Sequence, residues 1–307
     1  MNKINVAILG VTGYTGNEAE KLLLPRKDID IVYAPTVRYS GKKEEIEHLK
    51  KAQVVLSFLP HEQSMNAIPE ILEIVGYVID LSGAYRLKNV SDYPVWYGFQ
   101  HHYPTLLKEA VYGLPEINRH LIRDARLIAS AGCYETAMIL GLWPLVTERL
   151  ISSGIEVKAV SGYSGAGKSA ERPKKITPYK GGQQHQHIPA VEQALGMPGK
   201  ILFFPSVAPY KRGIEMVISV KIDRDLTTGE LEDLYEDFYR EEPFVRVKRF
   251  VSRKEVNYRN FCDIACNVKE GMTNIRVALD NLRKGASSQI IQNLNIICGL
   301  PETQGLL

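Results

Sequence analysis

Apolar residues recur along the first part of the chain in short runs that are separated by stretches of helical spacing. The predicted strands are the runs at 3–9, 29–33, 54–59 and 78–81, and the predicted helices between them lie at 17–24, 43–52 and 64–75. Such alternation predicts an α/β fold with a doubly wound parallel sheet of the Rossmann type.

Beyond residue 157 the pattern changes, because strand-like runs accumulate around one amphipathic helix at 227–240. These runs lie at 157–162, 201–204, 215–222, 244–250 and 261–268. Strands crowded with a single helix predict an antiparallel α+β domain rather than a second nucleotide fold. A last apolar helix at 287–298 is expected to pack back on the first domain.

The composition is that of a soluble globular enzyme of about two domains, with 307 residues, 45% hydrophobic and 24% charged. A net charge of +3 is too small to indicate nucleic-acid binding by itself. No apolar run approaches the roughly 18 residues of a membrane span, and the N-terminus has no signal-peptide pattern. Four cysteines without a CxxC pair favour a reducing, cytoplasmic location.

Cys133 occupies the junction between a short strand at 125–129 and a helix that runs to residue 150. The unpaired N–H groups and the dipole at a helix N-terminus stabilise an anion, and therefore favour the nucleophilic thiolate. Gly132 leaves the sulfur open to a substrate. The local sequence equally allows a buried structural cysteine, so the rest of the chain has to decide.

A glycine turn follows the first strand, with Gly10, Gly13 and Gly16 in a G-x-x-G-x-x-G spacing. Glycines there let the backbone approach a pyrophosphate that the helix N-terminus stabilises. After the second strand, where an acidic residue would bind the ribose of NAD, the chain has Arg38, followed by Lys42 and Lys43. A cation suits the 2′-phosphate of NADP, although a solvated basic loop is the alternative.

His185 and His187 face the same way if their segment is extended. With Cys133 they would supply a general base and acid, and with a third ligand they would bind a metal. His101 and His102 lack further ligands at metal spacing, and His61 is interpreted as a surface-loop histidine.

The segment 162–169 formally fits a phosphate-binding loop, but no long helix follows it, so a nucleoside triphosphatase is disfavoured. Cys262 and Cys266 are interpreted as core residues that share one face of a strand.

Taken together, these motifs resemble the N-acetyl-gamma-glutamyl-phosphate reductase family of the aspartate-semialdehyde dehydrogenase superfamily, over nearly the whole chain. The matching segments are 10–16, 38–41, 59–61, 80–82, 85–87, 112–119, 132–134, 164–167, 185–187, 212–213 and 280–286. The resemblance implies an NADP-binding Rossmann domain at 1–132 and 282–307. It also implies an inserted α+β domain at 133–281, like the C-terminal domain of glyceraldehyde-3-phosphate dehydrogenase, which forms the interface of a dimer or tetramer.

The same resemblance implies the reaction, an NADPH-dependent reduction of N-acetyl-gamma-glutamyl phosphate to N-acetylglutamate 5-semialdehyde in arginine biosynthesis. Cys133 would form a thioester, His187 would be the general acid/base with His185 beside it, and no metal is needed. The implied cofactor-binding residues are Gly10, Thr12, Gly13, Tyr14, Thr15, Gly16, Arg38, Pro60, Ser164, Gly165 and Gln289. The implied substrate-binding residues are Arg86, Glu116, Arg119 and Arg212, since carboxylates and phosphates suit arginine.

The chain departs from the family pattern at several positions. Family members usually carry Asn-Pro where Ser130 and Ala131 stand, Pro in place of Glu135, and an acidic residue in place of Ala190. The chain is also short, chiefly between residues 33 and 54. The segment Ala131-Gly132-Cys133 is more similar to that of reductases that act on aminoadipyl or glutamyl phosphate attached to an acidic carrier protein. The basic run 246–254 would suit such a carrier.

The free N-acetyl substrate is the favoured interpretation, and a carrier-linked substrate is the alternative. An alternative of another class is an NADPH-sensing protein that catalyses nothing. Such a protein would keep the glycine turn and Arg38 but would not need Cys133 and His187 together.

Overall fold

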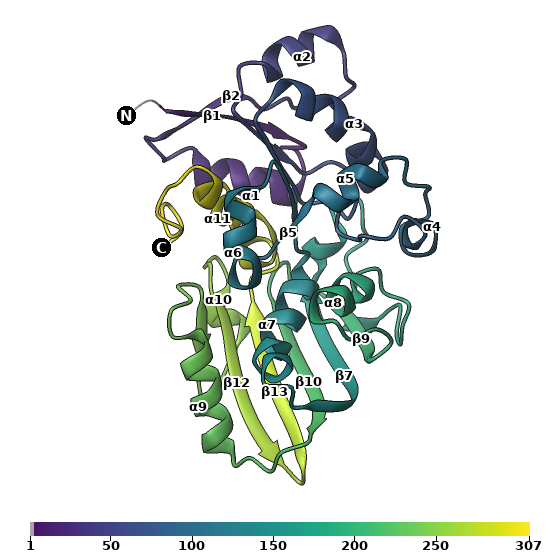
Figure 1. Cartoon of the computed structure of the whole chain (residues 1–307), viewed down its shortest axis with the longest axis vertical. Coiled ribbons are helices and arrows are strands. Elements are labelled where there is room, and N and C mark those ends of the chain that lie inside the picture. Colours follow the sequence, from purple (N-terminus) through teal and green to yellow (C-terminus); the bar gives the residue numbers. More distant parts are fainter. Residues whose placement is uncertain (1–2) are drawn as a thin grey trace. The chain divides into compact units, whose positions relative to one another are not determined.

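The computed structural model describes residues 3–307, and the chain divides into two compact units (Figure 1). The first unit runs up to Gly132 and includes Ala286–Leu307, and the second unit is Cys133–Gly285. Within the described residues, none of the helices is long and apolar enough to cross a membrane.

The first unit is built on a six-stranded sheet in the order β2-β1-β3-β4-β6-β5, in which every neighbouring pair is parallel. Its strands are β1 (Ile4–Leu9), β2 (Ile29–Tyr33), β3 (Val54–Ser57), β4 (Tyr77–Asp80), β5 (Val111–Gly113) and β6 (Leu127–Ser130). Its α-helices are α1 (Tyr14–Leu23), α2 (Lys43–Leu49), α3 (His61–Ile74), α4 (Asp92–Trp96), α5 (Pro104–Glu109), α6 (Pro115–Arg123) and α11 (Ser288–Ile297). The predicted Rossmann-type sheet is therefore confirmed, with α11 packed against α1 and α6 as expected for the last helix.

Several local expectations for this unit were wrong. The helix α3 begins at His61, so this histidine does not lie in a surface loop. Its Nδ1 accepts a hydrogen bond of 2.8 Å from the N–H of Gly83, and its ring meets that of Tyr97 edge to face. The helices α4, α5 and α6 and the strand β5 were not predicted, because their segments are short and rich in proline and tyrosine.

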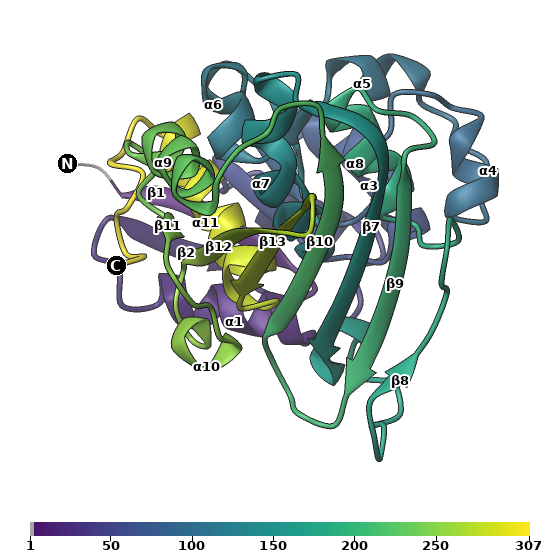
Figure 2. The same ribbon diagram turned by 90° about the horizontal axis from the view of Figure 1, so that it is seen from below.

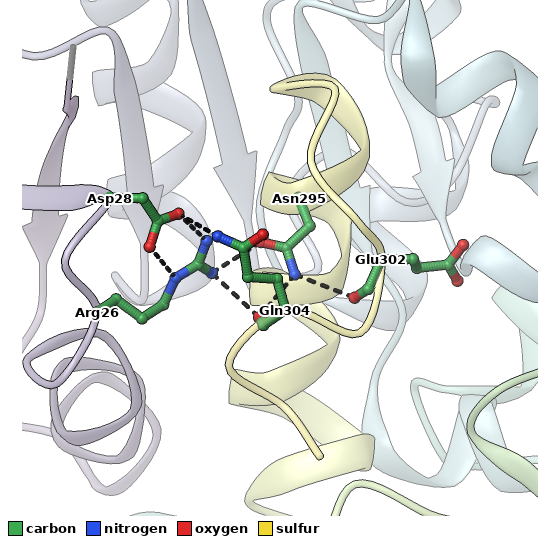
Figure 3. A network of polar contacts seen from close by, with 5 residues as sticks. All are labelled: Arg26, Asp28, Asn295, Glu302 and Gln304. Carbon is green, nitrogen blue, oxygen red and sulfur yellow. Dashed lines mark hydrogen bonds and ion pairs between the residues drawn. The ribbon is translucent and has the colours of Figure 1, made fainter. Parts of the chain in front are cut away.

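A network of polar contacts ties the C-terminal segment to the turn between α1 and β2 (Figure 3). Arg26 donates to both carboxylate oxygens of Asp28 and, over 2.7 Å, to the side-chain oxygen of Asn295. Asn295 in turn donates to the backbone oxygens of Glu302 and Gln304. The Arg26 side chain lowers the pKa of the Asp28 carboxyl, mainly through their hydrogen bond. These contacts fix the end of the chain on the first unit.

The second unit contains a seven-stranded sheet in the order β11-β12-β13-β10-β7-β9-β8. Its strands are β7 (Ile151–Gly162), β8 (Thr177–Pro178), β9 (Ile201–Ala208), β10 (Ile214–Ile222), β11 (Val245–Val247), β12 (Cys262–Lys269) and β13 (Met272–Leu279). Its helices are α7 (Cys133–Thr147), α8 (Ile188–Leu195), α9 (Thr228–Tyr239) and α10 (Arg253–Val256), and η1 (Tyr163–Ala166) is a short 3-10 segment. The π segment η2 (Arg283–Ser287) begins in the second unit and ends in the first. The expected α+β character is confirmed.

The expectation of an antiparallel domain was wrong for two of the strand pairs. The strands β7 and β9 pair in parallel, as do β11 and β12, so the sheet is mixed. Figure 2 shows β10, β7 and β9 running side by side. A strand that the sequence did not predict, β13, joins β12 to β10.

Helices α7, α8 and α9 pack on this sheet, and α7 approaches it closely. A side chain at Gly141 would place its Cβ 2.5 Å from the Cδ1 of Ile218 on β10, so only glycine fits there. Tyr235 on α9 donates a hydrogen bond of 2.6 Å to the Gly141 oxygen. Cys262 and Cys266 are buried on β12, as expected for core residues. The sheet and these contacts hold α7 in place, and with it Cys133.

Candidate active site

Cys133 is the first residue of α7, which confirms the predicted position in the first turn of a helix. Its side chain is half-buried. A Cβ atom at Gly285 would lie 2.7 Å from the Cβ of Cys133, so glycine is required for the chain to pass this close. Burial raises the pKa of Cys298 to about 11 and raises that of Cys266 even further from its ordinary value. These two thiols are consequently protonated at neutral pH.

His187 is the residue that caps the N-terminus of α8, and its ring faces the first turn of α7. Its Nε2 lies 3.7 Å from the Oε1 of Glu135, two residues after Cys133. The Glu135 side chain is fully buried, and that of His187 is 12% exposed. The packing of α7 against α8 thus brings an imidazole and a carboxylate to the turn that carries the cysteine.

His185 is more deeply placed than His187. Its Nδ1 accepts a hydrogen bond of 3.2 Å from the backbone N–H of His187, and its ring meets those of Tyr134, Tyr179 and Phe203 edge to face. Burial, together with the charges of His187 and Lys180, lowers the pKa of His185 to about 2. A neutral imidazole that already accepts a backbone hydrogen bond is suited to fix the start of α8.

The loop Ser164–Gly167 and the segment around Arg212 are joined by Asn281. The Asn281 amide donates to the Ser164 hydroxyl over 3.0 Å, and its oxygen accepts from the Gly213 N–H over 2.7 Å. Arg212 is buried, with its Nε 3.1 Å from an Asp280 carboxylate oxygen and its guanidinium stacked on the Tyr258 ring. The glycine loop after β7 forms only the 3-10 segment η1, so the phosphate-binding loop of a triphosphatase is absent from this described region.

The glycine turn of the first unit has the geometry of an anion cradle. Gly10 has a φ of +84°, and a Cβ there would lie 2.7 Å from the backbone oxygen of Phe58. A Cβ at Gly16 would lie 2.3 Å from the Gly10 oxygen. The helix α1 starts directly after the turn, with Gly13 as its capping residue and Tyr14 and Thr15 in its first turn. Backbone N–H groups at this end can hold a pyrophosphate; Thr12 lies in the same turn.

Arg38 lies beyond β2 in a loop that side chains hold in place. Its Nε donates to the Oε1 of Gln63 over 3.0 Å, and the Gln63 amide donates to the Tyr39 oxygen. The Glu45 carboxylate accepts from the backbone N–H of Ser40 and of Lys42. Arg38, Ser40 and Gln63 line one pocket of this unit. Pro60, the other predicted cofactor residue in this part, caps the N-terminus of α3.

The remaining predicted residues of the first unit fall into two groups. The first group, Arg86 and Gln289, lies against the segment before Cys133. Arg86 donates a hydrogen bond of 2.9 Å to the backbone oxygen of Ser130, and a further one to that of Leu81. Gln289 donates to the backbone oxygen of Ala131 over 3.3 Å.

The second group belongs to the contacts of the C-terminal segment. Arg119 makes a two-pronged ion pair with Glu302, with distances of 2.6 and 3.1 Å. Glu116 accepts a hydrogen bond from Gln292, which also donates to Glu302. The structure therefore gives Arg119 a carboxylate partner within its own unit.

Sequence reasoning missed Glu135 as a member of the site. Its only local signal was its place two residues after Cys133, and its proximity to His187 arises from packing. Among the described residues, no group of three or more His, Cys, Asp or Glu side chains is arranged to hold a metal ion.

Comparisons with known proteins match each unit to one part of a semialdehyde dehydrogenase. Residues 5–125 match the model of the NAD binding domain, and residues 133–281 match that of the dimerisation domain. An N-acetyl-gamma-glutamyl-phosphate reductase from Geobacter metallireducens is 40% identical over 99% of this chain and 98% of its own. One from Desulforudis audaxviator is 39% identical over 99% and 98%. The first alignment spans 339 positions, so that relative has residues without a counterpart among the 307 of this chain.

Solved structures support the fold. Aspartate semialdehyde dehydrogenase II from Vibrio cholerae superposes with a TM-score of 0.74 at 17% identity, over 97% of this chain and 99% of that chain. The aspartate semialdehyde dehydrogenase from Francisella tularensis gives a TM-score of 0.72 at 14% identity, over 96% and 100%.

Proposed function

The chain belongs to the N-acetyl-gamma-glutamyl-phosphate reductase family, and on this premise we propose that it reduces N-acetyl-gamma-glutamyl phosphate with NADPH. The products are N-acetylglutamate 5-semialdehyde, inorganic phosphate and NADP. The observation that carries the proposal is the first turn of α7, where Cys133 leads the helix and the buried Glu135 meets the His187 ring. A thiol at a helix N-terminus, with an imidazole packed against the same turn, provides a nucleophile and an acid/base for acyl transfer.

Cys133 acts first, as the nucleophile. Its thiolate forms a bond to the carbonyl carbon of the acyl phosphate, and the bond from that carbon to the phosphate oxygen breaks. The overall reaction consumes one proton, and a protonated His187 gives it to the departing phosphate. The acyl group is left as a thioester on the Sγ atom. NADPH, when bound, would supply the hydride that reduces this thioester. The C–S bond then breaks, which releases the semialdehyde and returns the Cys133 thiolate.

The residues of the glycine turn fit the pyrophosphate of the cofactor. Side chains at Gly10 and Gly16 would occupy the space beside the turn, and the N-terminus of α1 favours a negative charge. Arg38, oriented by Gln63, would bind the 2′-phosphate. We assign Ser164, Gly165, Pro60 and Gln289 to the nicotinamide half of the cofactor.

For the substrate we assign Arg86, Glu116, Arg119 and Arg212. Of these four residues, Arg212 lies in the same unit as Cys133. Its buried guanidinium pairs with the Asp280 carboxylate and stacks on the Tyr258 ring. The first unit would thus bind the phosphates of the cofactor, and the second would carry the nucleophile. The protein would form a dimer or tetramer through the seven-stranded sheet of the second unit. Alternate residues of β9, including Leu202 and Phe204, are exposed on that sheet.

The basic run 246–254 does not support an acidic carrier protein as the bearer of the substrate. Arg246 makes a two-pronged contact with the buried Asp263, at 2.7 and 2.9 Å. Lys248 lies 3.2 Å from Asp263 and 3.0 Å from Glu255. Two cations of the run are thus paired inside the unit, and the relatives named N-acetyl-gamma-glutamyl-phosphate reductase favour the free N-acetyl substrate, which remains our proposal.

The proposal is tested by running the reaction in reverse. Purified protein is mixed with N-acetylglutamate 5-semialdehyde, NADP and inorganic phosphate, and the formation of NADPH is followed by absorbance. We expect NADPH to form only when phosphate is present. Absence of turnover with intact NADPH binding would favour a carrier-linked substrate or a non-catalytic NADPH sensor, and absence of NADPH binding would overturn the proposal.

Replacing Arg38 with alanine is expected to weaken NADPH binding while kcat changes little. A charge-assisted hydrogen bond contributes about 1.5–3 kcal/mol, which corresponds to a rise in the KM for NADPH of roughly 10- to 100-fold. The KM for NADH, which has no 2′-phosphate, should stay the same. The control is Lys51→Ala, which removes an exposed cation after α2. Unchanged NADPH and NADH constants in Arg38→Ala would refute this role.

A further inference from the structure

We propose that Glu135 is a positioning residue for His187, so that its buried carboxylate orients the imidazole and stabilises the protonated ring during catalysis. The inference rests on the function proposed above and adds a positioning residue to it.

The first step is the burial of the Glu135 carboxylate. Its side chain is 0% exposed, and its Oε1 lies 3.7 Å from the Nε2 of His187. An ionised carboxylate away from water is costly unless a cation or hydrogen-bond donors compensate it. His187 is a partner that is protonated at the start of the proposed reaction, and Glu135 also stands in the first turn of α7, where the helix dipole favours an anion.

The second step is the position of the contact, which lies where the starts of two packed helices meet. Glu135 stands in the first turn of α7, His187 caps the N-terminus of α8, and the two helices pack against each other. The first turn of α8 contains no acidic residue, and Ala190 in it is buried. Of these two helix starts, that of α7 therefore brings the carboxyl group to the imidazole.

The third step is the charge environment of the His187 ring. The titratable groups that meet this ring are Glu135 and Tyr134 from α7 and His185 from the segment that precedes α8. The Tyr179 ring meets that of His185, Lys180 acts electrostatically on His185, and Cys133 belongs to the same turn of α7 as Glu135. Burial raises the pKa of Tyr179 to about 12 and that of Tyr134 further, so both are neutral at physiological pH. His185 is neutral as well, because its pKa is lowered to about 2. Glu135 is thus the acidic side chain that meets the imidazole.

A nearby negative charge favours the protonated form of every group around it. Removing the charge of Glu135 should make both the Cys133 thiol and the protonated His187 lose their protons at lower pH. The acid limb and the alkaline limb of the rate profile should therefore move in the same direction, toward lower pH. A purely structural role for Glu135 would change the amount of folded protein without moving this profile.

The test compares Glu135→Gln, which keeps the shape and removes the charge, with Glu148→Gln. Glu148 is exposed just beyond the far end of α7, so its replacement is the matched control. For each variant, kcat and KM are measured from pH 5 to 10, and thermal unfolding is recorded. We expect Glu135→Gln to lower kcat by about 10²-fold, within the range that proton transfer contributes, with little change in KM. Both limbs should move down by about one pH unit, and Glu135→Asp should give an intermediate loss.

A second measurement does not depend on the substrate. The rate at which iodoacetamide alkylates Cys133 is followed against pH by mass spectrometry of the Cys133 peptide. We expect the midpoint of this profile to fall in Glu135→Gln and to stay in place in Glu148→Gln. An unchanged rate and an unchanged alkylation profile in Glu135→Gln would overturn the inference, even with an active wild type. An inactive wild type with a shifted alkylation profile would overturn the proposed substrate and leave the link between Glu135 and the site standing.

Discussion

We expect the Cys133→Ala variant to lose turnover by about 10⁴-fold or more, because the acyl group then has no atom to which it can be transferred. Cys133→Ser should be nearly as inactive, since a hydroxyl is far less ionised than a thiol at neutral pH. Both variants should bind NADPH as the wild type does, because the predicted cradle for the cofactor phosphates lies in the first unit. Turnover is measured in the reverse, phosphate-dependent direction, and NADPH binding by fluorescence.

The control for this prediction is Cys298→Ala. Cys298 follows α11, and burial raises its pKa to about 11, so it cannot act as a thiolate at neutral pH. Its replacement should leave kcat within a few-fold of the wild type. Retention of more than a hundredth of the activity in Cys133→Ala would remove the thioester from the mechanism, whatever the substrate.

The local structures that the sequence predicted correctly, the glycine turn and the helix start at Cys133, are encoded in contiguous residues. The turn Gly10–Gly16 combines a positive φ at its first glycine with a close backbone approach at its last, and both demands can be met only by glycine. Cys133 was placed at the start of a helix because a strand pattern and a helix pattern meet at that point. Signals of this kind do not depend on what lies elsewhere in the chain.

The failures lie where structure depends on distant partners or on short elements. The strand β13 carries an alternating pattern, with Thr273, Ile275 and Val277 buried. The polar residues Asn274 and Arg276 interrupt its apolar run, so that the sequence does not mark it as a strand. The parallel pairing of β7 with β9 follows from the path of the chain between them, which periodicity does not report. Proline at the first position of α6 is compatible with a helix, yet proline and tyrosine in that region favoured a loop interpretation.

The same distinction applies to the charged residues of the site. Arginine is well suited to bind an oxyanion, but the partner of Arg119 in the structure is Glu302, which lies 183 positions further along the chain. In the sequence, Glu135 is an acidic residue in the first turn of a predicted helix, which is a common position for glutamate. Its contact with His187 arises from the packing of α7 on α8. Residue types therefore predicted the chemistry, whereas the pairing of charges needed the fold.

The second large effect is expected from the two histidines, whose roles the sequence left open. His187→Asn should lower kcat by about 10²- to 10⁴-fold, the contribution of a positioned acid or base. His185→Asn should lower kcat by less than about 10-fold, because the asparagine oxygen can replace Nδ1 as acceptor for the His187 N–H. The two identical substitutions serve as controls for each other. Equal kinetic losses would refute the separation of roles.

The pH dependence of stability separates the histidines independently of catalysis. His185 has a pKa of about 2 in the folded protein, against an ordinary value of 6.5. Between these values the unfolded chain binds the additional proton, so the contribution of His185 to stability is present above pH 6.5 and is lost as the pH falls below it. Between pH 7 and pH 5 the wild type should lose about 2 kcal/mol that His185→Asn does not lose. Urea denaturation at the two pH values measures this difference. If the free energy of unfolding fell equally in the wild type and in His185→Asn, the buried imidazole could be protonated in the folded protein. His185 would then be a candidate for the proton transfer beside His187.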